Sequence, residues 1–81
     1  MAWKEIEKGL QKRFDCQDFK SALELVNEIG RVAETAQHHP DICFGWGYVE
    51  ITITTHSENG ITEKDHSLAS QIDALKQDLA N

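Results

Sequence analysis

The histidines are the residues of this chain with the clearest capacity for chemistry. All four lie between positions 38 and 66, and three of them are predicted to converge. His38 and His39 leave the end of a predicted helix, and His56 ends a predicted strand. Imidazole both donates and accepts protons near neutral pH, so this group indicates a general acid–base site.

Two carboxylates accompany these imidazoles. Glu34 lies one helical turn before His38, where a carboxylate can orient a ring. Asp65 is expected in the first turn of the last helix, after the loop that begins at His56. Two plainer interpretations stay open, because a histidine pair before a proline is typical of an exposed helix end and Asp65 can serve as a helix cap.

Other chemistry finds little support in the spacing. Ser57 with a histidine and an acid would suggest a hydrolase, but no G-x-S-x-G elbow surrounds it. A zinc site lacks C-x-x-C or H-E-x-x-H spacing, and adjacent histidines rarely bind one ion together. Its only conceivable ligands would be His38, His39, His56 and Cys43.

The first half of the chain predicts two strands and a helix that leads to the histidine pair. Short strands are expected over 3–6 and 10–14, around the turn signal at 7–9. The helix begins after the N-cap Asp18 and must end near His39, because the residue before Pro40 is pushed out of the helical region. Its apolar stripe is Phe19, Ala22, Leu23, Val26, Ile29, Gly30, Ala33 and Ala36.

The second half predicts two strands and a second helix. Strands are expected over 41–44 and 48–55, joined by a glycine-rich turn at 45–47. The second strand alternates, with Val49, Ile51 and Ile53 on its dry face, and parity would place His56 on its polar face. Trp46 and Tyr48 could stack on a flat ligand or simply cover the sheet.

After a loop over 57–61, the run Thr62–Asp65 has the form of a capping box with aspartate in place of the usual glutamate or glutamine. The helix that follows carries the stripe Leu68, Ala69, Ile72, Leu75 and Leu79.

These elements predict an α+β fold over a single domain, residues 1–81. It is a two-layer sandwich in β-β-α-β-β-α order, with a four-stranded antiparallel sheet and its helices packed on one face. The net charge of −6 argues against a nucleic-acid or membrane surface as partner. Two cysteines, with neither an apolar span nor a signal peptide, indicate a reducing, cytoplasmic setting. A core this small favours a homo-oligomer.

The chain resembles the pterin-4a-carbinolamine dehydratases. The resemblance rests on Glu34-x-x-x-His38-His39-Pro40, followed by Trp46, His56 and Asp65 at the family's intervals, and it covers nearly the whole chain. It implies dehydration of a 4a-hydroxytetrahydropterin to the quinonoid dihydropterin, a homodimer or homotetramer, and no metal or bound cofactor.

Carried onto this sequence, the resemblance implies specific roles. His38 and His56 would form the acid–base pair, in an order that the sequence does not fix, while His39 would mainly hold the ring and assist proton transfer. Glu34 and Asp65 would orient and tune imidazoles, and Trp46 would lie beside the pterin. In two places the chain departs from the family: there is no helix ahead of Trp3, and Cys16 stands where a phenylalanine is common.

Relatives with this fold also act as interaction proteins, namely dimerisation cofactors of a homeodomain transcription factor and assembly chaperones of a carbon-fixing enzyme. A purely adaptor role places no demand on the acid–base residues. Because Glu34, His38, His39, His56 and Asp65 are all present, the sequence favours the enzyme.

Overall fold

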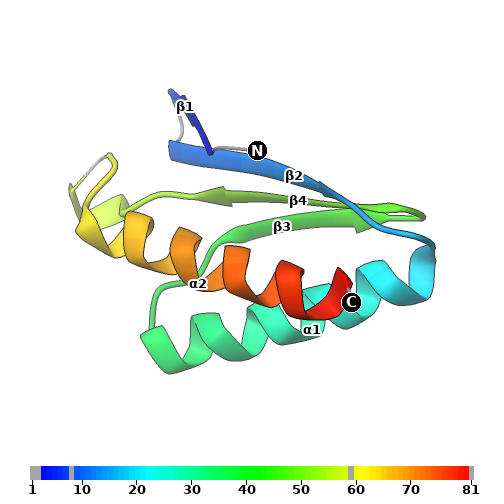
Figure 1. Cartoon of the computed structure of the whole chain (residues 1–81). Coiled ribbons are helices and arrows are strands. Elements are labelled where there is room, and N and C mark those ends of the chain that lie inside the picture. Colours follow the sequence, from blue (N-terminus) through cyan, green and yellow to red (C-terminus); the bar gives the residue numbers. More distant parts are fainter. Residues whose placement is uncertain (1–2, 8, 59, 81) are drawn as a thin grey trace.

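The computed structural model describes residues 3–7, 9–58 and 60–80, with the backbone alone for His56 and residues 76–80. The elements are β1 (Lys4–Ile6), β2 (Gly9–Asp15), α1 (Phe19–Ala36), β3 (Asp41–Gly45), β4 (Tyr48–Ile53), the short 3₁₀ helix η1 (His56–Glu58) and α2 (Glu63–Ala80). The strands form one antiparallel sheet in the order β1-β2-β4-β3, and both helices cover the same face (Figure 1). The predicted two-layer α+β sandwich is confirmed.

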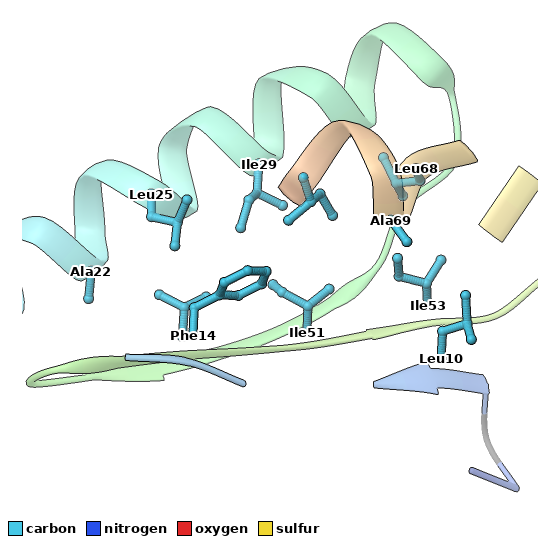
Figure 2. Packing of buried hydrophobic residues seen from close by; sticks show 11 residues of the cluster. Leu10, Phe14, Ala22, Leu25, Ile29, Ile51, Ile53, Leu68 and Ala69 are labelled. Atoms are coloured by element: carbon cyan, nitrogen blue, oxygen red, sulfur yellow. The ribbon is translucent and has the colours of Figure 1, made fainter. Parts of the chain in front are cut away.

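The core lies between the sheet and the two helices (Figure 2). The predicted alternation holds along β4, where Val49, Ile51 and Ile53 are fully buried. Their partners on β2 include Leu10 and Phe14, which are buried on the same face. From α2 the core receives Leu68, Ala69 and Ile72, as the predicted stripe requires, whereas the side chain of Leu79 lies outside the described residues.

The buried face of α1 differs from the predicted stripe. Phe19 and Leu23 were expected inside but are 46% and 40% exposed, while Leu25, which the prediction omitted, is fully buried. The buried positions are Ala22, Leu25, Ile29 and Ala33. They follow a spacing of three and four, which defines one narrow stripe, and Phe19 and Leu23 lie at its margin. Phe19 instead packs its ring on Phe44 at the edge of the sheet.

The strand predicted over 48–55 is shorter in the structure. Regular pairing stops at Ile53, and Thr55 forms an isolated bridge with Gly60. Because η1 begins at His56, the two-residue alternation does not extend to that histidine. The part of the chain that the structure describes contains no helix long and apolar enough to cross a membrane.

Candidate acid–base site

The end of α1 places the histidine pair. The helix ends at Ala36, earlier than the predicted end near His39, because Gln37 adopts a left-handed conformation with φ +53°. The Gln37 N–H donates to the Glu34 carbonyl and the His38 N–H donates to the Ala33 carbonyl, each at 3.2 Å. This pair of bonds is a Schellman motif, which reverses the chain and directs His38 toward the start of α2.

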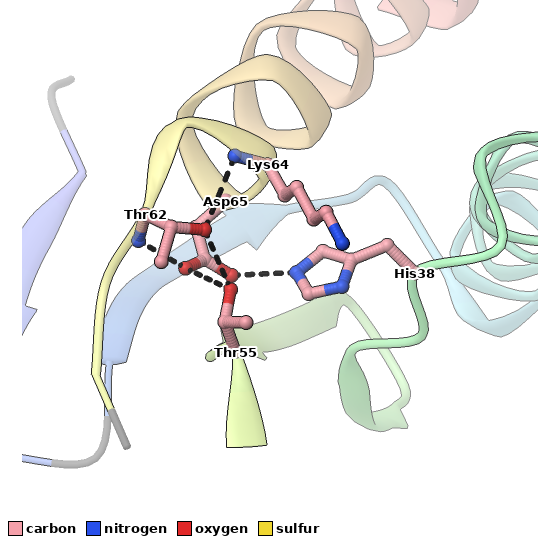
Figure 3. Close-up of polar contacts among 5 residues, drawn as sticks. All are labelled: His38, Thr55, Thr62, Lys64 and Asp65. Atoms are coloured by element: carbon pink, nitrogen blue, oxygen red, sulfur yellow. Dashed lines mark hydrogen bonds and ion pairs between the residues drawn. The ribbon is translucent and has the colours of Figure 1, made fainter. Parts of the chain in front are cut away.

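His38 contacts the buried Asp65, as the dashed line in Figure 3 marks. Its Nε2 lies 2.6 Å from Asp65 Oδ1, with the His38 side chain 13% exposed and that of Asp65 fully buried. An ionised carboxylate only accepts hydrogen bonds, so His38 Nε2 carries a proton and donates it. The other ring nitrogen, Nδ1, is therefore the atom left for chemistry.

Asp65 is held by two further donors. Its Oδ2 accepts from the Thr62 backbone N–H at 2.7 Å and from the Thr55 hydroxyl at 2.8 Å. Burial raises the pKa of this carboxyl, but the hydrogen bonds from His38, Thr62 and Thr55 outweigh that effect and leave the pKa below its ordinary value. Asp65 is thus ionised at neutral pH.

The predicted capping box is also present. Thr62 Oγ1 accepts from the Lys64 N–H at 3.3 Å while the Asp65 carboxylate reaches back to the Thr62 N–H. The two interpretations of Asp65 therefore both hold, because one oxygen caps α2 and the other binds His38.

Thr55 is a member of this network that sequence reasoning missed. It is 4% exposed, and its hydroxyl binds Asp65. A signal did exist, because alternation from Val49, Ile51 and Ile53 puts position 55 on the apolar face. A hydroxyl at such a position requires a buried partner.

His39 pairs with the other predicted carboxylate. Glu34 was expected to act one turn ahead, on His38, but its Oε2 contacts His39 Nε2. The pair is open to solvent, with side chains 55% and 71% exposed for His39 and Glu34. It orients His39 while adding little to stability.

The structure does not show the remaining predicted site residues beside His38. The side chain of His56 lies outside the described residues, although its backbone follows Thr55 directly, so its convergence stays a prediction. Trp46 is 73% exposed in the β3–β4 turn, at the end of β3 away from Pro40, and β3 spans about 17 Å. Its role beside a substrate also stays a prediction. Tyr48 packs under the Arg13 guanidinium, 4.3 Å from the ring centroid, and so covers the sheet.

An open hollow adjoins the His38–Asp65 pair. It measures about 450 Å³, lies between the end of α1 and the first turns of α2, and is lined by His38, Lys64, Ser67 and Gln71 among others. This volume is within the range of small-molecule sites, about 300–1,000 Å³. Within residues 3–7, 9–58 and 60–80, no group of three histidine, cysteine, aspartate or glutamate side chains is placed to hold a metal ion.

Comparison with known proteins identifies the family. The family model described as pterin 4 alpha carbinolamine dehydratase matches residues 1–75. The chain belongs to this family. A relative from Rubrobacter xylanophilus is 46% identical over 90% of this chain and 69% of its own length, and one from Aromatoleum aromaticum is 41% identical over 91% and 68%. Both carry the name "Putative pterin-4-alpha-carbinolamine dehydratase".

Solved structures of the family share the fold. A transcriptional coactivator/pterin dehydratase from Brucella melitensis superposes with a TM-score of 0.86 at 30% identity, covering 91% of this chain and 81% of that one. A pterin dehydratase-like protein described as a RuBisCO assembly factor in the alpha-carboxysome gives 0.81 at 28% identity, covering 94% and 90%. Membership of the family is therefore accompanied by more than one described role.

Proposed function

We propose that this protein is a 4a-hydroxytetrahydrobiopterin dehydratase that removes water from the pterin-4a-carbinolamine in tetrahydrobiopterin recycling. The observation that carries the proposal is the buried Asp65 carboxylate that fixes the Nε2–H of His38, beside a hollow of small-molecule size. An adaptor would need Asp65 only as the cap of α2, whereas the oxygen that fixes the Nε2–H of His38 serves an acid–base role.

The reaction needs one proton delivered and one removed. The N5 lone pair of the pterin expels the 4a-hydroxyl as an acid protonates the leaving oxygen, and a base takes the N5 proton. The carbinolamine thus becomes quinonoid dihydropterin and water, with no covalent intermediate. Imidazoles perform both steps near neutral pH.

We assign the residue roles from the family resemblance together with the two carboxylate–imidazole contacts. His38 and His56 form the acid–base pair, and His38 acts through Nδ1 because Nε2 is bound to Asp65. His39, whose Nε2 is bound to Glu34, holds the pterin ring and assists proton transfer. The proposal requires no metal and no resident cofactor.

We place the active protein in the cytoplasm as a homodimer or homotetramer. Strands β1 and β3 are the edges of the sheet, and an edge strand offers unpaired backbone groups to another copy. A chain this small buries only a thin core of its own, and association with another copy would bury more apolar surface.

A second candidate is an interaction protein of the same fold. Three exposed large apolar side chains, Phe19, Leu23 and Trp46, support it, together with the assembly role described for a structural relative. The two candidates differ in what they demand of the histidines, since docking alone does not require an acid–base pair.

The test is a dehydration assay on synthetic 4a-hydroxytetrahydropterin. Ultraviolet absorbance monitors the reaction, and the rate with protein is compared with the spontaneous rate in buffer. The proposal expects catalysis that saturates with substrate. A rate that matches buffer alone at micromolar protein would contradict it and favour the interaction protein.

A further inference from the structure

Thr55 is a buried polar side chain that the proposed chemistry does not use directly. Among the described residues only Thr55 and Asp65 combine a polar side chain with burial, and the two are hydrogen-bonded to each other. They come from different elements, since Thr55 follows β4 and Asp65 lies in the first turn of α2. Figure 3 shows both at the point where these elements meet.

The hydroxyls of Thr55 and Thr62 each donate to one defined acceptor. Thr55 Oγ1 lies 2.8 Å from Asp65 Oδ2 and 2.8 Å from Thr62 Oγ1. Because ionised Asp65 can only accept, Thr55 donates to it and must then accept from the Thr62 hydroxyl. Thr62 in turn accepts from the Lys64 N–H. One chain of donors thus runs from α2 through both threonines into Oδ2.

This series of hydrogen bonds fixes the plane of the Asp65 carboxylate. With two donors on Oδ2, from Thr55 and the Thr62 backbone, the other oxygen is left to face His38 Nε2 at 2.6 Å. We propose that Thr55 is a positioning residue, which holds the Asp65 carboxylate in the orientation that presents His38 to the substrate. The inference rests on the proposed dehydratase function. Thr55 acts through Asp65, because its single proton is committed to that carboxylate.

The test compares Thr55→Val with a matched control in β4, the strand that Thr55 follows. Valine keeps the β-branched shape and removes only the hydroxyl. The control, Thr52→Val, makes the same change on the opposite face, where the threonine accepts from the Gln11 amide at 3.2 Å. Thr55→Ser restores a hydroxyl. Thr55→Ala replaces the valine variant if melting curves show that the latter does not fold.

The expected result is a split between rate and binding. Thr55→Val should lower kcat on the order of tenfold, the usual scale for losing an orienting partner, with KM unchanged within about twofold. Thr55→Ser should recover most of the rate, and Thr52→Val should match the wild type. A folded valine variant with wild-type kcat, or a serine variant that recovers nothing, would overturn the inference.

A second readout separates this inference from the dehydratase proposal. A carbon-13 NMR titration of the Asp65 carboxyl should show a higher pKa in Thr55→Val, because one of the donors that lowers it is gone. If the wild type proves inactive as a dehydratase, the proposed function fails while this titration still decides whether Thr55 holds Asp65. An unchanged titration would refute the positioning role whatever the activity.

Discussion

Replacing Asp65 by asparagine should move the ring proton of His38 from Nε2 to Nδ1. The amide oxygen of asparagine will take the place of Oδ2, since Thr55 and the Thr62 N–H both donate there. The amide nitrogen then occupies the place of Oδ1 and faces His38 Nε2. Because that nitrogen donates, His38 must accept through Nε2 and carry its proton on Nδ1, which removes the lone pair left for proton transfer.

The cost in stability follows from the bonds that change. The bond from His38 loses its charged acceptor, which corresponds to about 1.5–3 kcal/mol, and the bonds from Thr55 and Thr62 weaken as they become neutral. Asparagine avoids the desolvation of a buried carboxylate, which offsets part of this. The net loss is about 2 kcal/mol, or roughly 8–16 °C in Tm for a domain of this size, so the Asp65→Asn variant should still fold.

The stability that the Asp65→Asn variant loses should depend on pH in a defined direction. The pKa of Asp65 is lower in the folded protein than in the unfolded chain. Its ionised form therefore stabilises the fold above the unfolded value of about 3.9, and this contribution disappears as pH falls through the folded pKa. The wild type and the Asp65→Asn variant should differ fully at neutral pH and converge below about pH 4.

Urea unfolding across that pH range measures the stability, and nitrogen-15 NMR of His38 reports which ring nitrogen is protonated. Dehydration should slow on the order of tenfold or more, but less than in a variant that lacks His38, because orienting an imidazole contributes less than supplying the proton. An Asp65→Asn variant with wild-type rate and the proton still on Nε2 would refute the reasoning.

Three further outcomes are expected. His39→Ala should raise KM for the pterin at least as much as it lowers kcat, whereas His66→Ala, which alters an exposed residue of α2, should change neither; the reverse ranking in steady-state assays would reassign the ring-holding role. Activity should persist in strong chelator, with no stoichiometric zinc by elemental analysis, and one zinc per chain whose removal abolishes activity would contradict the mechanism. Light scattering at micromolar concentration should give a mass above 9.2 kDa, and a uniform monomer would count against the proposed assembly.

The sequence predicts the layers of the fold because its periodicities are strong. The alternation of Val49, Ile51 and Ile53 and the stripe of α2 leave one arrangement that buries both. The sequence predicts the end of α1 too late, because the proline rule sets only the last residue that a helix can reach and does not show where a left-handed residue ends it. Gln37 takes that conformation despite its side chain, and local pattern gives no signal for it.

The sequence indicates that two carboxylates orient the histidine pair but not which carboxylate binds which imidazole, and the places of His56 and Trp46 at the site stay predictions. Spacing along the helix connects Glu34 to His38, but the Schellman turn after Ala36 moves His38 to Asp65 and leaves Glu34 to His39. Which carboxylate binds which imidazole depends on that change of direction. The capping box at Thr62, in contrast, is local and was predictable.

The central claim is that imidazoles of this chain catalyse the dehydration. The most direct measurement is the dehydration rate of 4a-hydroxytetrahydropterin with His38→Ala and with His56→Ala, each shown to be folded by a melting curve. We expect each variant to slow turnover by roughly 10²-fold or more, the usual scale for removing a general acid or base. If both variants are folded and both retain near wild-type rates, these histidines are not the catalysts and the interaction protein becomes the better account.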